Sequence, residues 1–233
     1  NKGRRTICKS LRQFSQEGEI MDIEHVLPQD IEKRSMQIIE EELGEVRLDP
    51  DKKDIIKRVI HTSADFEYAH NLRFSNDAVE SALNAIRHGC TFLTDTNMAC
   101  TGINVGALKK TGGAKICYMA DEEVAAKAKA DGTTRATASM DKACDIKGPL
   151  IVAVGNAPTA LFRLADLIDE GKITPDLVIG VPVGFVNVIQ AKERIMTCKV
   201  PYIVAAGRKG GSNVAAAICN ALLYKVIRGE DTK

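Results

Sequence analysis

The chain has 233 residues, of which 45% are hydrophobic and 27% charged, with 32 basic side chains against 31 acidic ones. A net charge of +1 gives no field suited to coating a nucleic acid, and an aromatic content of 4% offers few surfaces for stacking bases. No apolar run approaches the roughly 20 residues that cross a bilayer, and no secretory signal pattern is present, so we expect a cytoplasmic protein without nucleic-acid or membrane partners.

The first part of the chain has a helical pattern. Residues 1–27 begin with a cluster of cations, and we expect them to form a poorly ordered N-terminal extension. Beyond them, apolar residues recur at helical spacing behind capping residues such as Asp49 and Ser75. The predicted helices span residues 30–43, 50–61, 64–70 and 75–89.

From Thr91 onward, short apolar strands alternate with helices. The predicted strands span residues 91–94, 115–119, 150–154, 177–181 and 202–206. The predicted helices span residues 121–130, 134–144, 159–170, 186–197 and 212–228. This alternation predicts an α/β fold with a doubly wound, mostly parallel sheet of about five strands and helices on both faces. We expect residues 28–233 to form a single α/β domain, in which the helical N-terminal part covers one edge of the sheet.

Glycine-containing turns follow three of the predicted strands. Gly155 allows a sharp turn after the strand over 150–154, and Pro158 suits the first turn of the next helix. The free N–H groups of that helix start are expected to face a ligand carrying carboxylates or phosphates. Two similar junctions lie at residues 182–186 and 207–212, and all three belong at the carboxyl ends of strands, where open α/β sheets bind ligands.

Five sequence blocks, in this order, resemble the precorrin-8X methylmutase family, whose members are also called cobalt-precorrin-8 methylmutases. They are HTSADFE at 61–67, TDTNM at 94–98, GNAPTALF at 155–162, GVPVGFV at 180–186 and GRKGGS at 207–212. Each block alone is a moderate indication, whereas all of them in order are specific. The resemblance covers the chain from about Pro28 to Arg228.

The resemblance implies an isomerase of cobalamin biosynthesis. Its reaction moves a methyl group from C11 to C12 of a corrin precursor, precorrin-8X or cobalt-precorrin-8, and yields hydrogenobyrinate or cobyrinate. The reaction involves no redox change, so the resemblance implies no cofactor. Any cobalt would belong to the substrate, and we expect no metal site in the protein.

His61 is the candidate catalytic residue. Taken by periodicity alone, a histidine near a helix C-terminus is explained by its interaction with the helix dipole. In the family, however, the histidine of this block is the general acid, a role suited to a side chain that exchanges protons near neutral pH. His25, His70 and His88 have no such context.

The resemblance also implies a substrate with several acetate and propionate groups. Arg34 and Arg135 match motif arginines, and a guanidinium grips a carboxylate with two N–H groups. The candidate substrate-binding residues are Arg34, Ser35, Thr62, Asp95, Met98, Thr134, Arg135, Asn156, Ala157, Thr159, Gly184, Phe185, Arg208, Lys209, Gly210 and Gly211.

Structural alternatives stay open for several of these residues. Asp95, Asn156 and Thr159 are also suitable helix caps. Phe185 suits a plain core position as well as an apolar wall of the site, and Arg208 suits a solvated surface charge as well as a carboxylate contact.

Two other functions compete with the isomerase. A nucleotide-dependent enzyme on a Rossmann-like sheet fits the fold class, but neither G-x-G-x-x-G after a strand nor G-x-x-x-x-G-K-[ST] occurs. A corrinoid-binding carrier would need the carboxylate contacts but not His61. The seven cysteines include no C-x-x-C pair, which argues against a zinc site. We also expect a homodimer with its site near the subunit interface.

Overall fold

The computed structural model describes residues 13–14, 20–21 and 24–230, and the chain divides into two compact units between Gly44 and Glu45. The N-terminal unit contains the antiparallel pair β1 (Gln13–Phe14) and β2 (Ile20–Met21), the 3-10 helix η1 (Pro28–Asp30) and helix α1 (Ile31–Leu43). The remainder of the extension expected over residues 1–27 lies outside the described residues, apart from 24–27.

The C-terminal unit is built on a six-stranded sheet with the order β3-β8-β7-β6-β4-β5. Its strands are β3 (Leu72–Phe74), β4 (Thr91–Thr94), β5 (Ala114–Ile116), β6 (Leu150–Val154), β7 (Leu177–Gly180) and β8 (Tyr202–Ala205). All neighbouring strands pair in parallel except β3, which runs antiparallel to β8. The predicted doubly wound, mostly parallel α/β fold is therefore confirmed.

Strand β3 is the strand that the sequence pattern does not predict. It has only three residues, and of these only Leu72 is fully buried, so it lacks the apolar run of the central strands. Pairing with β8 defines it instead, since Leu72 lies opposite Ala205 and Phe74 opposite Ile203. A short edge strand of this kind depends on its neighbour rather than on its own composition.

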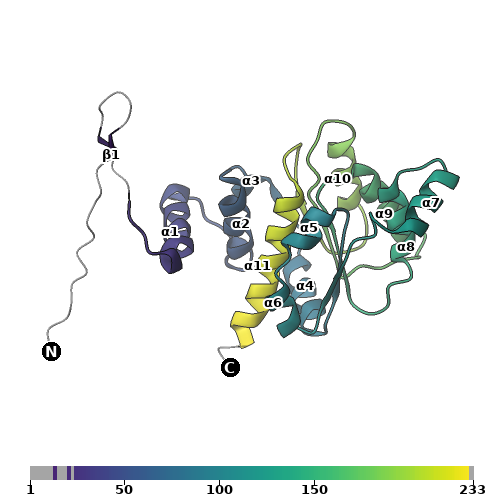
Figure 1. Cartoon of the computed structure of the whole chain (residues 1–233), viewed down its shortest axis with the longest axis horizontal. Helices are drawn as coiled ribbons and strands as arrows, with labels where there is room; N and C mark the ends of the chain where they lie inside the picture. The colour runs from purple at the N-terminus through teal and green to yellow at the C-terminus, as the bar shows by residue number, and fades with distance from the viewer. Residues whose placement is uncertain (1–12, 15–19, 22–23, 231–233) are drawn as a thin grey trace. The chain divides into compact units, whose positions relative to one another are not determined.

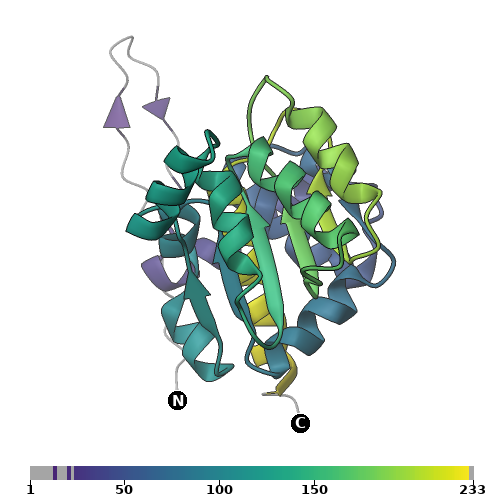
Figure 2. The same cartoon turned by 90° about the vertical axis from the view of Figure 1, so that its right-hand side faces the viewer.

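Helices cover both faces of this sheet (Figures 1 and 2). One layer, arranged around α11 (Ser212–Glu230), also includes α2 (Pro50–Ser63), α4 (Ala78–Arg87), α5 (Asn97–Gly102) and α6 (Val105–Lys110). The opposite layer consists of α7 (Glu122–Ala130), α8 (Arg135–Ala143), α9 (Pro158–Asp169) and α10 (Val188–Met196). The short helix α3 (Tyr68–Asn71) connects α2 to β3. A buried apolar core lies between this second layer and the strands.

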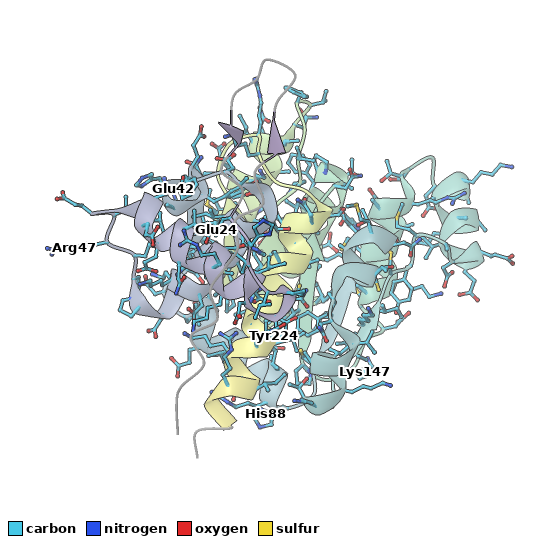
Figure 3. The ribbon with its side chains drawn as sticks, turned by 60° about the vertical axis from the view of Figure 1, so that its left-hand side comes forward. Glu24, Glu42, Arg47, His88, Lys147 and Tyr224 are labelled. Atoms are coloured by element: carbon cyan, nitrogen blue, oxygen red, sulfur yellow. The ribbon has the colours of Figure 1, made fainter. Side chains whose placement is uncertain are left out.

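Helix α2 packs against α11, and this contact places the end of α2. The Arg58 guanidinium lies 5.2 Å from the ring centre of Tyr224 on α11. The hydroxyl of Tyr224, labelled in Figure 3, accepts a 3.1 Å hydrogen bond from Asn104 Nδ2. His88 and Lys147, also labelled there, precede β4 and β6 and so belong to the amino ends of the strands.

Local capping changes some of the predicted boundaries. Helix α4 begins at Ala78 rather than beside Ser75, because the Ser75 hydroxyl accepts from the Tyr202 N–H and donates to Asp77. Helices α5 and α6 were not predicted; they are single short elements capped by the side chains of Thr96 and Asn104.

The order of the strands reverses between β4 and β6, which are adjacent in the sheet. From β4 the chain continues outward to β5, whereas from β6 it continues in the other direction to β7 and β8. Such a switch point leaves a crevice at the carboxyl ends of the strands, where α/β proteins bind ligands. We call the loops that follow β4, β6, β7 and β8 the carboxyl edge.

Candidate active site

Asp95 connects the two strands at the switch point. It follows β4 directly, and its side chain is only 1% exposed. Its Oδ1 accepts a 2.8 Å hydrogen bond from the Gly155 N–H, and its Oδ2 accepts bonds of 2.8 and 2.7 Å from the N–H groups of Asn156 and Ala157. Burial raises the pKa of Asp95, and the three N–H donors oppose that rise by favouring the carboxylate.

These contacts correct one expectation from the sequence. The N–H groups at the turn before α9 are not open to a substrate anion, because the protein's own carboxylate already occupies those of Gly155, Asn156 and Ala157. Pro158 begins the helix and has no N–H to offer. Asp95 is thus neither a helix cap nor a solvent-facing group in this structure.

The turn after β6 lies directly against the turn after β8. A Cβ atom on Gly155 would come within 2.7 Å of Ser212 Cα, so a glycine is needed for this approach. Gly210 is equally restricted, since a Cβ there would lie 2.1 Å from the Val181 carbonyl oxygen. The Ser212 hydroxyl is 2.8 Å from that of Thr96, which follows β4. Three strand ends therefore converge at one place.

The loop after β7 joins the same cluster. Gly184 donates its N–H to the Arg208 carbonyl over 3.2 Å, and Gly211 donates to Val181 over 2.8 Å. The Arg208 guanidinium lies 5.6 Å from the ring centre of Phe185, within the range of a cation–π contact. Phe185 is 82% exposed, which excludes the alternative of a core position for this ring.

Exposed apolar side chains are concentrated on these loops. Val186 is 79% exposed and Met98, just after β4, is 67% exposed. Large exposed apolar groups close to cations are typical of ligand and partner surfaces. The carboxyl edge thus offers both apolar contacts and positive charge.

Lys209 links the turn after β8 to the segment that follows His61. Its Nζ lies 2.6 Å from Asp65 Oδ2 and 3.0 Å from Glu67 Oε2. The ammonium holds the pKa of Asp65 below its usual range. Lys209 is partly exposed, and its charge is matched by two carboxylates of the HTSADFE block.

His61 lies in the last turn of α2, and its side chain is exposed. The helix ends at Ala64, which adopts the left-handed conformation with φ of 52°, an uncommon state for a residue other than glycine. Thr62, the neighbour of His61, is exposed as well. Because Asp65 and Glu67 bind Lys209, the end of α2 is held beside the GRKGGS turn.

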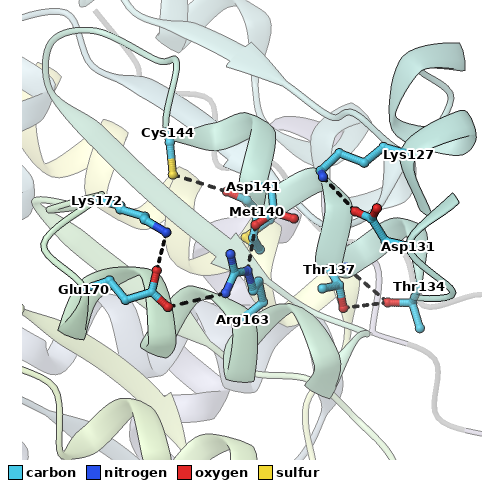
Figure 4. Close-up of polar contacts among 10 residues, drawn as sticks. All are labelled: Lys127, Asp131, Thr134, Thr137, Met140, Asp141, Cys144, Arg163, Glu170 and Lys172. Atoms are coloured by element: carbon cyan, nitrogen blue, oxygen red, sulfur yellow. Dashed lines mark hydrogen bonds and ion pairs between the residues drawn. The ribbon is translucent and has the colours of Figure 1, made fainter.

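Thr134 and Arg135 lie next to the turn after β6. Thr134 Oγ1 is 3.0 Å from Thr159 Oγ1, and it also caps α8 by accepting from the Thr137 N–H. Figure 4 shows the Thr134–Thr137 contact. Arg135 is exposed, and its Nη1 donates to the Met119 carbonyl over 3.4 Å.

Arg34 and Ser35 belong to the N-terminal unit and contact other residues of that unit. Arg34 Nε is 2.6 Å from Glu24 Oε1, and Arg34 Nη1 is 3.5 Å from Glu41 Oε1. The hydrogen bond with Glu24 raises the pKa of Arg34. Ser35 Oγ donates to the Ile31 carbonyl within α1.

One functional candidate was missed in the sequence. Lys192 on α10 is 1% exposed, and its Nζ donates to the carbonyl oxygens of Gly207 and Lys209, each over 2.8 Å. It stands on the apolar face of the predicted helix, together with Val188 and Ile195. A lysine on the buried face of an amphipathic helix is unusual, and this is the sequence signal that could have identified Lys192.

A separate groove of about 580 Å³ lies over α7, α8 and α9 and contains none of the predicted site residues. Its charges are paired, as Figure 4 shows: Arg163 with Asp141 at 2.6 Å and Lys127 with Asp131 at 2.7 Å. Within the described residues, no three His, Cys, Asp or Glu side chains are grouped as a metal site would require. No helix in the described part of the chain is long and apolar enough to cross a membrane.

The fold defines an α/β protein with a doubly wound sheet, and exposed apolar and cationic side chains lie at the carboxyl edge beside its switch point. Comparison with known proteins identifies the family, because the profile of the precorrin-8X methylmutases matches residues 30–225. The chain belongs to the precorrin-8X methylmutase family. It is therefore an isomerase of cobalamin biosynthesis that shifts a methyl group within one molecule.

Individual relatives match over most of their length. The cobalt-precorrin-8 methylmutase of Salmonella typhimurium is 48% identical over 204 residues, which cover 84% of this chain and 95% of the relative. The precorrin-8X methylmutase of Pseudomonas aeruginosa is 34% identical, covering 83% of this chain and 94% of the relative. The crystal structure of the Thermus thermophilus precorrin-8X methylmutase has a TM-score of 0.81 at 42% identity and covers 86% and 97% of the two chains.

Proposed function

We propose that this enzyme moves the methyl group from C11 to C12 of precorrin-8X or cobalt-precorrin-8, with His61 as the general acid. The observation that carries the proposal is the pair of contacts from Lys209 to Asp65 and Glu67, at 2.6 and 3.0 Å. They bring the block that contains His61 to the carboxyl edge. An acid there stands beside a surface with both apolar and cationic groups.

In this proposal His61 donates a proton to the conjugated macrocycle near C11. Protonation draws electron density through the ring system and so makes the migration of the methyl group easier. The substrate and the product are isomers, so the ring must give up a proton again when the methyl group has moved, and the enzyme is regenerated. A well-placed general acid contributes about 10²- to 10⁴-fold in rate, and the remainder depends on the orientation of the ring.

The carboxylates of the substrate are assigned to side chains rather than to the start of α9. Arg208 at the carboxyl edge and Arg135 at the start of α8 are exposed cations, and their guanidinium groups suit carboxylates. The paired hydroxyls of Thr134 and Thr159 add donors to the same turn. The exposed ring of Phe185 and the thioether of Met98 suit the apolar face of a macrocycle.

We further propose that the enzyme is a cytoplasmic homodimer with its site near the subunit interface. The exposed apolar side chains of Phe185 and Val186 support this, because a partner subunit or a bound macrocycle would remove them from water. For Arg34 and Ser35, a carboxylate contact stays a prediction from the sequence.

The test is an absorbance time course with precorrin-8X and, separately, cobalt-precorrin-8. Wild-type protein is expected to convert the substrate, whereas His61→Asn is expected to lose about 10²- to 10⁴-fold in turnover and to bind the pigment with nearly unchanged affinity. His70→Asn, which also removes an exposed imidazole, is the matched control and should retain full activity.

The other outcomes are equally informative. Equal turnover by wild type and His61→Asn would contradict the acid role. Binding without conversion by both proteins would support the corrinoid carrier instead. Failure of the wild type to bind either pigment would contradict the proposed substrates.

A further inference from the structure

Lys192 is a buried cation whose partners are backbone carbonyls alone. Its Nζ donates to Gly207 O and to Lys209 O, both at 2.8 Å, and the side chain is 1% exposed. Among the described residues, no carboxylate lies within ion-pair distance of this ammonium group. Burial lowers the pKa of Lys192 to about 8.

A buried ammonium group without a counter-ion is costly for a fold. A Leu or Met at this position would fit the apolar face of α10, where Val188 and Ile195 are buried beside it. The contribution of Lys192 must therefore come from the two hydrogen bonds that its ammonium group donates. Those bonds end on the carbonyl groups on either side of Arg208.

The two acceptors define the path of the GRKGG turn. Gly207 has φ of 78°, the left-handed conformation that glycine adopts without strain, and its carbonyl is held by Lys192. The carbonyl of Arg208, between the two acceptors, receives the N–H of Gly184. The backbone from 207 to 209 is therefore tied to α10 and to the loop after β7.

The side chains carried by this backbone segment are the cations of the candidate site. Arg208 extends over the ring of Phe185, with 5.6 Å between the guanidinium and the ring centre. Lys209 reaches Asp65 and Glu67, which follow His61. The ammonium group of Lys192 thus supports the backbone that carries both Arg208, the proposed carboxylate-binding arginine, and Lys209, which contacts the end of α2.

We propose that Lys192 is a positioning residue, which aims Arg208 and Lys209 by holding the carbonyl groups of residues 207 and 209. It acts on the substrate through the turn and does not touch it. This inference rests on the proposed function, because the effect of the turn is seen as binding of a polycarboxylate macrocycle.

The experiment compares Lys192→Met with Ile195→Ala in steady-state kinetics on precorrin-8X. Lys192→Met keeps a long apolar side chain but removes both donors, so KM is expected to rise about tenfold or more, with a smaller fall in kcat because the Lys209 contact to the end of α2 is also loosened. Ile195→Ala weakens the same helix without touching the turn, and its KM is expected to stay near that of the wild type.

Hydrogen exchange gives a second readout that does not need substrate. The amide of Gly184 donates to the Arg208 carbonyl, and the amide of Gly211 donates from the turn to the Val181 carbonyl. Both are expected to lose protection in Lys192→Met, while the amides of β6 keep theirs. If Lys192→Met does not fold, Lys192→Gln is used. The glutamine side chain is one atom shorter than that of lysine, so its NH₂ group does not reach both carbonyl oxygens. The same rise in KM is expected for it.

The failures are distinguishable. No turnover by the wild type would overturn the proposed function. An active wild type together with an unchanged KM in Lys192→Met would overturn the role of Lys192 alone, and so would an equal rise in KM for Ile195→Ala.

Discussion

Charged side chains at the carboxyl edge make most of their contacts with the protein itself. Asp95 accepts three backbone N–H groups, and Lys192 donates to two backbone carbonyls. Lys209 is paired with Asp65 and Glu67. Because these groups are already satisfied, Arg208, together with Arg135 next to the turn after β6, is best placed to meet a substrate carboxylate.

The pairing of Lys209 with Asp65 predicts a measurable titration. The pKa of Asp65 lies below its ordinary value because Lys209 donates to its carboxylate. A depressed folded-state pKa stabilises the fold above the unfolded-state pKa of about 3.9, and this contribution is lost as the pH falls through the folded-state value. In Lys209→Met the pKa of Asp65 is expected to move upward, because burial then acts without the ammonium group.

Carbon-detected NMR titration of the Asp65 carboxyl measures this directly. Lys172→Met is the control, since Lys172 pairs with Glu170 at 2.6 Å and is a lysine of a different ion pair. An Asp65 titration that is the same in Lys209→Met as in the wild type would show that the two side chains are not paired in solution.

At the scale of elements, the carboxyl edge depends on contacts between loops that belong to different strands. Asp95 joins the end of β4 to the turn between β6 and α9. Gly210 lets the turn after β8 approach the end of β7, where Val181 accepts the Gly211 N–H. The loops therefore form one connected structure rather than separate flexible segments.

Replacing Asp95 with Asn tests this connection. The asparagine side chain carries no charge, which removes the cost of burying one. Its NH₂ group replaces one of the two carboxylate oxygens, however, so at least one of the three backbone N–H groups loses its acceptor. A buried donor without an acceptor costs about 1–3 kcal/mol, so the free energy of unfolding is expected to fall by about 2 kcal/mol. Denaturant unfolding at neutral pH measures the change.

Asp131→Asn is the matched control for this variant. Asp131 pairs with Lys127 on the surface at 2.7 Å, with both side chains about half exposed, so its loss should cost less than about 0.5 kcal/mol. If Asp95→Asn is as stable as Asp131→Asn, the three hydrogen bonds do not hold the turn.

At the scale of the whole molecule, the exposed apolar side chains predict self-association. We expect a dimer in light scattering at micromolar concentration, because Phe185 and Val186 are among the most exposed large apolar residues described. Val186→Asp would place a charge in the interface and is expected to weaken dimerisation about tenfold or more. Val105→Asp, a change at an exposed valine on α6, is the control.

A monomeric wild type would contradict the dimer. A Val186→Asp protein that stays dimeric but has a raised KM for precorrin-8X would instead assign this surface to the macrocycle.

The fold class follows from the sequence by itself, and so does the position of the candidate site. Strands such as β6 are continuous apolar runs, and a strand buried on both faces must be covered by helices on both sides. The glycine turns after β6, β7 and β8 are visible as sequence blocks, and chain order alone places them at one edge of a parallel sheet. Local sequence patterns are sufficient to predict these strands and turns, because each of them depends mainly on residues that are neighbours in the chain.

Only the tertiary structure decided which polar groups remain open to a ligand. Asp95 and Gly155 are 60 positions apart, and Lys209 and Asp65 are 144 positions apart, yet each pair shares a hydrogen bond. Contacts of this kind leave no periodicity in the sequence, because they depend on where each strand ends and which turn lies beside it. For the same reason, the sequence predicts an anion site at the start of α9, whereas in the structure Asp95 occupies the N–H groups there. Likewise, nothing in the sequence shows that Lys192 binds the turn that carries Arg208.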